Sequence, residues 1–402
     1  MGIPPFVSSH NFCRFKGIIL LLQMIRAFVL LAFVASALGF APVPMMRGAR
    51  SSTGLEMALA SGEKVIVIGV AADSGCGKST FMRRLTKVFG GANVGPLGGG
   101  FDAGSWETNT LVSDKTTVIC LDDYHANDRQ GRKESGLTAL NVKEQNFDLM
   151  YEQIKALKDG KSIAKPIYNH VNGTLDTPET VEPTPIVIIE GLHPLVDSRV
   201  RDLLDFSIYL DISDDIKFAW KIQRDMAERG WTLEQVKESI EARKPDFAAY
   251  VEPQLGNADV VISVLPSETS KADLGKHLKV KLVQVMDKAG LDPTFMLAKD
   301  ATITAHPEIK ADTDCSVSLA SYKSKHYGRD VMVTEMDGKL VDINDFKTIE
   351  PLLSSTSAKT ATELSDEVIK VGADSPGALD GTGLFQTLTS FKLRDFYEKM
   401  VQ

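Results

Sequence analysis

Ala72-Asp73-Ser74-Gly75-Cys76-Gly77-Lys78-Ser79 is the stretch of sequence that decides the fold. It lies between a β-branched apolar run, Val65 to Ala71, and a segment from Ser79 to Phe89 whose apolar residues have helical spacing. In such a loop, glycines let backbone N–H groups turn toward phosphate oxygens, and the start of the helix adds partial positive charge. We therefore predict a phosphate-binding loop (P-loop), although Ala72 stands where this motif usually has its first glycine.

The loop gives its polar residues distinct roles. Lys78 can reach the β- and γ-phosphates of a nucleotide, and the Ser79 hydroxyl can ligate Mg²⁺. ATP and Mg²⁺ are therefore the expected cofactors. The predicted ATP-binding residues are Ser74, Gly75, Cys76, Gly77, Lys78, Ser79 and Thr80.

Further apolar runs of the buried-strand type alternate with helical segments. The runs are Thr116 to Leu121, Ile186 to Ile189, Phe206 to Leu210 and Val260 to Leu265, and the helical segments are Phe147 to Lys158, Asp197 to Leu204, Ile216 to Arg229 and Leu233 to Arg243. This order predicts an α/β protein with a three-layer P-loop kinase fold and a mixed, largely parallel sheet. Ligands are expected at the carboxyl ends of the strands. Near the C-terminus, Met336-Asp337-Gly338 between two apolar runs predicts a β-hairpin.

The first sixty residues have the form of a targeting sequence. Met24-Ile25-Arg26, the apolar run after it and the small residues Ala35-Ser36-Ala37 match a signal peptide, with Met24 as an alternative start. Residues 40–62 contain Arg and Ser but one acidic residue, which is typical of an organelle transit peptide. Ala35-Ser36-Ala37 and Phe40-Ala41-Pro42 together resemble the cleavage motif of algae with complex plastids, which implies the plastid stroma as the location.

These patterns divide the chain into four parts. We predict a signal peptide over residues 1–39, a transit peptide over 40–62, a P-loop kinase core over 63–265 and a C-terminal α+β part of the same catalytic unit over 266–402.

Composition narrows the range of partners. The 402 residues are 43% hydrophobic and carry a net charge of −8, which argues against a nucleic-acid partner because phosphate backbones are bound by clustered Lys and Arg. The sequence has no unbroken apolar run of membrane-spanning length, so we expect no membrane in the mature form. Four cysteines are too few for a disulfide framework in a chain of this length.

A second cluster of polar residues follows the next predicted strand. The run Val118 to Leu121 leads directly into Asp122, Asp123, Tyr124 and His125, with Arg129, Arg132 and Lys133 close behind. Phosphoryl transfer depends on positioning and charge neutralisation, so one carboxylate base and several cations are sufficient. Either aspartate could instead be a helix cap or a turn residue.

Two further features favour a kinase over a GTPase. The run Ile186 to Ile189 ends in Glu190-Gly191, where P-loop enzymes place the acid that orients Mg²⁺ or its water. The sequence contains no Asn-Lys-x-Asp motif for reading guanine.

Spacings of three and four put Lys221, Arg224 and Asp225 on one helix face. Such a face either forms salt bridges in solvent or stabilises a phosphoryl group in transfer.

Eight segments of the chain resemble phosphoribulokinases of the plant and cyanobacterial type. They are Ala71 to Arg84, Val118 to His125, Lys165 to Val171, Val187 to Pro194, Arg199 to Ser213, Lys217 to Gly230, Ile240 to Phe247 and Gly381 to Thr387. The resemblance implies an ATP-dependent kinase, a homodimer in this family, that makes ribulose 1,5-bisphosphate from ribulose 5-phosphate. Uridine kinases would share the P-loop, Val251-Glu252-Pro253 and Ala258-Asp259, but not this set of cations.

The resemblance also implies a role for each site residue. Asp122 would be the catalytic base, Lys78, Lys221, Arg224 and Asp225 would complete the catalytic face, and Ser79 and Glu190 would lie beside the metal. Contacts to ribulose 5-phosphate would come from His125, Arg129 and Arg229, with Tyr168 and His170 near its phosphate. A uridine kinase-like enzyme and a redox-assembled P-loop scaffold are the two alternatives.

Redox control is a further implication of the resemblance. Cys76 and Cys120 correspond to a thioredoxin-regulated pair, and the place of Cys76 near a helix start predicts an acidic thiol. Ile309 stands about where a partner of Cys315 would be, so the C-terminal bridge of this family cannot form. Family members also bind a small disordered linker protein together with glyceraldehyde-3-phosphate dehydrogenase.

Overall fold

A computed structural model describes residues 64–90, 110–269, 277–288, 302–304, 317–349, 365–366, 368–370 and 377–401. The side chains of residues 110–112, 224, 228, 229, 302–304, 348 and 349 are outside that description. The predicted targeting segments, Cys13 and Cys315 therefore lie outside the described residues. Within these ranges, no helix is both long and apolar enough to cross a lipid bilayer.

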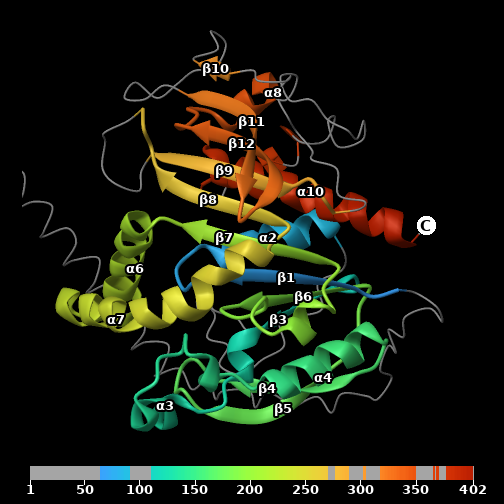
Figure 1. Ribbon diagram of the computed structural model, residues 1–402, viewed down its shortest axis with the longest axis vertical. Coiled ribbons are helices and arrows are strands. Elements are labelled where there is room, and N and C mark those ends of the chain that lie inside the picture. The colour runs from blue at the N-terminus through green and yellow to red at the C-terminus, as the bar shows by residue number, and fades with distance from the viewer. Residues whose placement is uncertain are drawn as a thin grey trace, which may run out of the picture. The chain divides into compact units, whose positions relative to one another are not determined.

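A ten-stranded mixed sheet forms the centre of the described chain (Figure 1). Its parallel part runs β8-β7-β1-β6-β3, which are Val260–Pro266, Phe206–Ile212, Ile66–Ala72, Ile186–Gly191 and Thr116–Cys120. All seven residues of β1 are buried, as expected for a parallel strand covered on both faces. The predicted α/β P-loop kinase fold is confirmed.

Antiparallel strands extend the sheet on both sides. Beyond β8 lie β9 (Leu278–Val285), β12 (Arg329–Asp337), β11 (Ser318–His326) and β10 (Thr302–Thr304), and beyond β3 lies β2 (Thr110–Val112). The hairpin predicted at Met336-Asp337-Gly338 is wrong. Both edges of β12 are already paired, with β9 and β11, so residues after Gly338 have no free edge to join. The hairpin turn is instead at Tyr327-Gly328, where both φ angles are positive.

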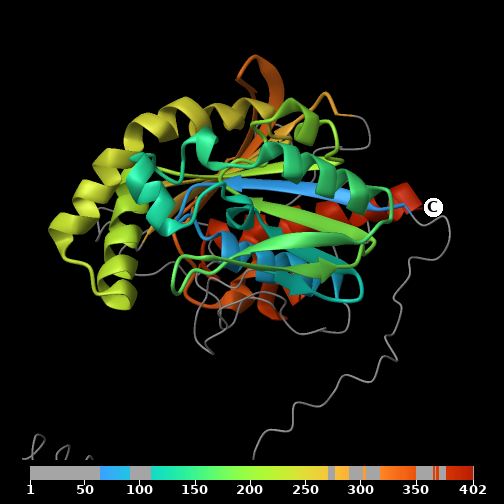
Figure 2. The same ribbon diagram turned by 90° about the horizontal axis from the view of Figure 1, so that it is seen from below.

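Helices cover the two faces of the sheet. On one face, α2 (Lys78–Phe89) packs with the long C-terminal helix α10 (Gly381–Val401), and Figure 2 shows both on the same side of β1. On the other face, α4 (Phe147–Lys158) and α5 (Ser198–Arg201) bury Met150, Ile154 and Val200. Successive residues of a strand point to opposite faces, so Ile66 and Val67 belong to different cores. The described chain therefore has three layers: helices, the central sheet and helices.

The remaining elements are helices, short helical turns and a separate two-stranded sheet. They are η1 (Leu121–Tyr124), α3 (Arg129–Ser135), η2 (Val142–Glu144), the hairpin β4 (Ile163–Tyr168) and β5 (Leu175–Val181), α6 (Asp214–Arg229), α7 (Leu233–Asp246), η3 (Phe247–Val251), η4 (Glu252–Asn257), η5 (Ile343–Asp345) and α8 (Phe346–Ile349). Figure 1 shows α6 and α7 beyond the end of β7. The division of the chain at residue 266 stays a prediction.

Candidate active site

The P-loop connects β1 to α2 as the sequence predicted. Gly75 and Gly77 have φ angles of 86° and 77°, a region that disfavours residues with a Cβ. Gly77 is the N-cap of α2, no side chain caps the helix, and its first turn contains no acidic residue. The N–H groups at the start of α2 therefore have no side-chain acceptor that would exclude a phosphate.

Lys78 lies in the electrostatic field of two carboxylates. Burial alone would lower the pKa of Lys78, but Glu190 and Asp122 outweigh burial and raise it. Glu190 lies near the end of β6 and Asp122 lies two residues after β3. These strands are neighbours, so all three residues belong to the same edge of the sheet. Lys78 is held in its charged form, which is the form that binds phosphate.

Glu190 has the properties of a carboxylate that faces a cation. Its Oε2 is buried and has no hydrogen-bond partner among the described residues, and burial raises the pKa of its carboxyl group. An uncompensated carboxylate oxygen beside a P-loop fits Mg²⁺ or a water bound to it. Ser79 lies in the first turn of α2, directly after the P-loop, and it is exposed.

Asp122 faces the site and is surrounded by positive or ionisable groups. Burial favours its neutral form, but His125, His170 and Lys78 together outweigh burial and lower the pKa of Asp122. His125 Nε2 lies 4.0 Å from Asp122 Oδ1, and the Gln145 side-chain amide lies 2.9 Å from His125 Nδ1. Asp122 is therefore an ionised carboxylate at neutral pH. The neighbouring His125 ring is held in place by its contact with Gln145.

Asp123 points away from the site and is a structural residue. Its side chain is fully buried and forms an ion pair with the equally buried Lys165. Its Oδ1 accepts a hydrogen bond from the Tyr168 N–H at 2.8 Å. Asp123 therefore anchors β4, whereas the role of Asp122 as the catalytic base stays a prediction.

Aromatic rings connect the predicted substrate residues. The Tyr168 ring packs edge-on against His125 at 5.2 Å and against His170 at 5.1 Å between ring centres. Arg129 donates to the His170 carbonyl oxygen at 2.7 Å, and Arg132 donates to the Tyr168 hydroxyl at 2.6 Å. The structure thus brings His125, Arg129, Tyr168 and His170 together with Asp122, and it adds Arg132, which was not among the predicted site residues.

The predicted catalytic helix is α6. Lys221 and Asp225 form a buried ion pair of 2.7 Å one turn apart. Arg224 and Arg229 lie on the same helix, and nothing is described of their side chains.

A second cluster of cations lies beside the P-loop, and the sequence analysis did not predict it. Asp73 of the P-loop contacts Arg243 of α7 at 3.1 Å and Lys217 of α6 at 3.6 Å. Arg243 is 170 residues away along the chain, so no local pattern could have paired it with Asp73. The contacts link the P-loop to both helices beyond β7.

Cys76 and Cys120 are both free thiols in the structure. The predicted acidity of Cys76 is wrong: burial, reinforced by Asp73, raises the pKa of its thiol to about 12. Burial also raises the pKa of Cys120, with Glu190 and Asp122 adding to the effect. Loss of solvation therefore outweighs the positive field of Lys78 and the helix start.

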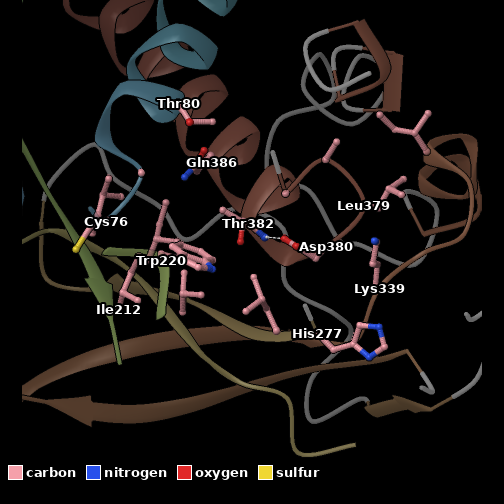
Figure 3. A pocket seen from close by; sticks show the side chains of 18 of the residues that line it. Cys76, Thr80, Ile212, Trp220, His277, Lys339, Leu379, Asp380, Thr382 and Gln386 are labelled. Carbon is pink, nitrogen blue, oxygen red and sulfur yellow. Dashed lines mark hydrogen bonds between the residues drawn. The ribbon is translucent and has the colours of Figure 1, made fainter. Parts of the chain in front are cut away.

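A cavity of about 830 Å³ adjoins the P-loop (Figure 3). It is lined by β7 and β8, which lie on the other side of β1 from β6 and β3. Cys76 and Thr80 line one end, and His277 and Lys339 line the other. Its walls include the apolar ends of β7 and β8, Trp220 of α6 and the start of α10. The P-loop therefore lies between a polar site at β3 and β6 and a large, partly apolar cavity at β7 and β8.

Comparison with known proteins identifies relatives of the chain. The sequence model of the Phosphoribulokinase / Uridine kinase family matches residues 67–270. The chain is 52% identical to a chloroplastic phosphoribulokinase of Chlamydomonas reinhardtii over 85% of this chain and 90% of the relative. It is 47% identical to a phosphoribulokinase of Synechocystis over 84% of this chain and 96% of the relative. A uridine kinase of Borrelia hermsii is 30% identical over 57% of this chain and 98% of the relative.

Proposed function

We propose, because the chain belongs to the phosphoribulokinase and uridine kinase family, that it uses MgATP to phosphorylate ribulose 5-phosphate at O1. The product is ribulose 1,5-bisphosphate, a Calvin-cycle intermediate. The observation that carries the proposal is an identity of about half of all residues with phosphoribulokinases over more than four fifths of the chain. The uridine kinase relative is both more distant and limited to 57% of the chain.

Asp122 is the general base in the proposed mechanism. Its carboxylate accepts the proton of the O1 hydroxyl while O1 bonds to the γ-phosphorus, and the bond to the β–γ bridging oxygen breaks to release ADP. Lys78, Lys221 and Arg224 neutralise charge on the transferred group, and Asp225 holds Lys221. When bound, Mg²⁺ would be held by Ser79 and Glu190 and would neutralise charge on the β- and γ-phosphates.

The two sides of the P-loop support separate places for the two substrates. The sugar phosphate would lie on the β3 and β6 side, in contact with His125, Arg129, Tyr168, His170 and Arg229. The adenosine half of ATP would occupy the cavity on the β7 and β8 side, where Trp220 offers an aromatic surface in the wall. The γ-phosphate would then lie between them, within reach of Lys78.

One assay tests the proposed function. Release of ADP from MgATP is measured with ribulose 5-phosphate and, separately, with uridine. We expect turnover with the sugar phosphate and none with uridine. Turnover with uridine alone would establish the uridine kinase alternative, and turnover with neither would favour the redox-assembled scaffold.

Replacing Arg129 by Ala is expected to raise KM for ribulose 5-phosphate by about tenfold or more, because it removes a cation that faces a dianion and supports the His170 loop. KM for ATP should not change, since the P-loop is untouched. Lys133→Ala is the matched control: it removes the same charge from an exposed position in the same helix. Steady-state kinetics with each substrate varied in turn measures both constants, and a change in the ATP constant alone would contradict the assignment of Arg129.

Location and partners complete the proposal. Several relatives are chloroplastic phosphoribulokinases, which supports a plastid location for this chain. The predicted signal and transit peptides would direct it to the stroma of a complex plastid. A homodimer, control by thioredoxin through Cys76 and Cys120, and assembly with a disordered linker protein and glyceraldehyde-3-phosphate dehydrogenase are proposed from the resemblance.

A further inference from the structure

We propose that Cys120, Asp122 and His170 form a binding site for a thiophilic divalent cation, with Zn²⁺ as the expected ligand. One thiol sulfur, one carboxylate oxygen and one ring nitrogen from these residues all lie within 4.8 Å of one another. Sulfur and imidazole nitrogen are ligands that Zn²⁺ prefers, whereas Mg²⁺ prefers oxygen. Three protein ligands leave a fourth position for water. The site is therefore distinct in chemistry from the proposed Mg²⁺ position at Ser79 and Glu190.

Each ligand is held by the fold. Cys120 is the last residue of β3 and pairs in register with Glu190 of β6, and Asp122 follows it in η1. His170 lies in the turn between β4 and β5, where its ring packs edge-on against Tyr168 and its carbonyl accepts from Arg129. Gly173 of the same turn lies so close to Arg129 that a Cβ there would approach Arg129 Cβ to 2.5 Å. Zinc binding would bring the three ligand atoms slightly closer together than they are in the structure. The turn that carries His170 is already ordered, so this movement is small.

The site combines acidic and positive groups. The Asp122 and Glu190 carboxylates both act on Cys120, and the groups that oppose them around Asp122 are His125, Lys78 and Arg132. Binding breaks the Cys120 S–H bond, forms a zinc–sulfur bond and releases one proton to solvent, with no oxidation or reduction. The metal replaces that proton and leaves the carboxylates compensated.

Zinc and ribulose 5-phosphate should exclude each other, because Asp122 and His170 would serve both. This competition rests on the proposed function, whereas metal binding itself does not. Zinc is therefore expected to inhibit the kinase, and saturating sugar phosphate should weaken zinc binding by about tenfold or more.

Direct binding of zinc to the reduced full chain tests the site. Affinity is measured by competition with a chromophoric chelator, and Co²⁺ is used as a spectroscopic probe because thiolate ligation gives a ligand-to-metal absorption band. Cys120→Ser and His170→Asn should each weaken zinc binding by at least tenfold, and Cys120→Ser should abolish the cobalt–thiolate band. Cys76→Ser is the matched control and should retain both signals. Thermal melting of each variant verifies that it is folded.

Two outcomes would overturn the site, and a third would separate it from the proposed function. Unchanged zinc affinity in Cys120→Ser or in His170→Asn would remove a required ligand. Loss of binding in Cys76→Ser as well as in Cys120→Ser would indicate a chelate of two thiols instead. Zinc binding that depends on Cys120 and His170 but is not displaced by ribulose 5-phosphate would support the metal site and contradict the proposed sugar-phosphate site.

Discussion

Asp122→Asn is expected to reduce kcat by about 10²–10⁴-fold, the usual contribution of a positioned general base, while ATP binding persists. The substitution keeps the size of the side chain and removes its ability to accept a proton. The P-loop, Lys78 and Glu190 are unchanged, so the nucleotide should bind with its normal dissociation constant. The measurements are kcat from steady-state ADP release and the ATP dissociation constant from calorimetry.

Asp128→Asn is a suitable control for this prediction. Asp128 is the N-cap of α3, where its side chain accepts from the Gly131 N–H, and asparagine is an equally good cap. Its kcat should stay close to the normal value. Near-normal kcat in Asp122→Asn would contradict the assignment of the base, and loss of ATP binding in that variant would show that the carboxylate acts on the nucleotide instead.

The lowered pKa of Asp122 also sets the expected pH profile. A base whose pKa lies below its ordinary value of 3.8 is fully ionised at neutral pH and becomes protonated only as the pH falls through that lowered value. Asp122 should therefore contribute no decrease of kcat/KM above about pH 5.

Short-range signals in the sequence were enough to predict the P-loop and the edge of the sheet where the chemistry lies. The order of strand, glycine-containing turn and helix identified the loop, and a carboxylate after an apolar run identified Asp122 and Glu190. These features depend on neighbours in the chain. The family resemblance then supplied the roles of His125, Tyr168 and His170, which the structure brings together around Asp122.

The features that the sequence could not give depend on long-range contacts. Asp122 and Asp123 are equivalent in the sequence, and the partner that separates them, Lys165, is 42 residues away. The hairpin signal at Asp337-Gly338 failed because β12 was already paired on both sides. The acidity of Cys76 was wrongly predicted because a helix start is a local feature, whereas burial of the thiol results from packing of the whole core.

Lys165→Met is expected to lower the free energy of unfolding by about 3–5 kcal/mol, because it leaves the Asp123 carboxylate buried without its cation. Lys155→Met is the matched control. Lys155 forms an ion pair with Asp159 of 3.1 Å on the surface, so its loss should leave the free energy of unfolding nearly unchanged. Denaturant unfolding followed by circular dichroism measures both values. The Tyr168 N–H also depends on Asp123, so KM for ribulose 5-phosphate should rise in the Lys165 variant.

Adding Asp123→Asn to Lys165→Met should recover part of the lost stability. The double variant removes the fully buried Asp123 charge and leaves the partly buried Glu179 carboxylate, which Lys165 also contacts at 3.1 Å. The Asn side-chain oxygen can still accept the Tyr168 N–H. A double variant as unstable as Lys165→Met alone would mean that packing of the lysine side chain, and not the unpaired carboxylate, causes the loss.

The pH dependence of the single variant separates the same two causes. Burial already raises the pKa of Asp123, and loss of the Lys165 cation would raise it further. A carboxyl group whose pKa is higher in the folded state binds more protons there than in the unfolded state, so its contribution to stability falls as the pH rises above the unfolded value. The stability deficit of Lys165→Met should therefore be smaller at pH 5 than at pH 8. A deficit that does not change with pH would exclude a buried, unpaired Asp123 as its origin, because a packing defect binds no proton.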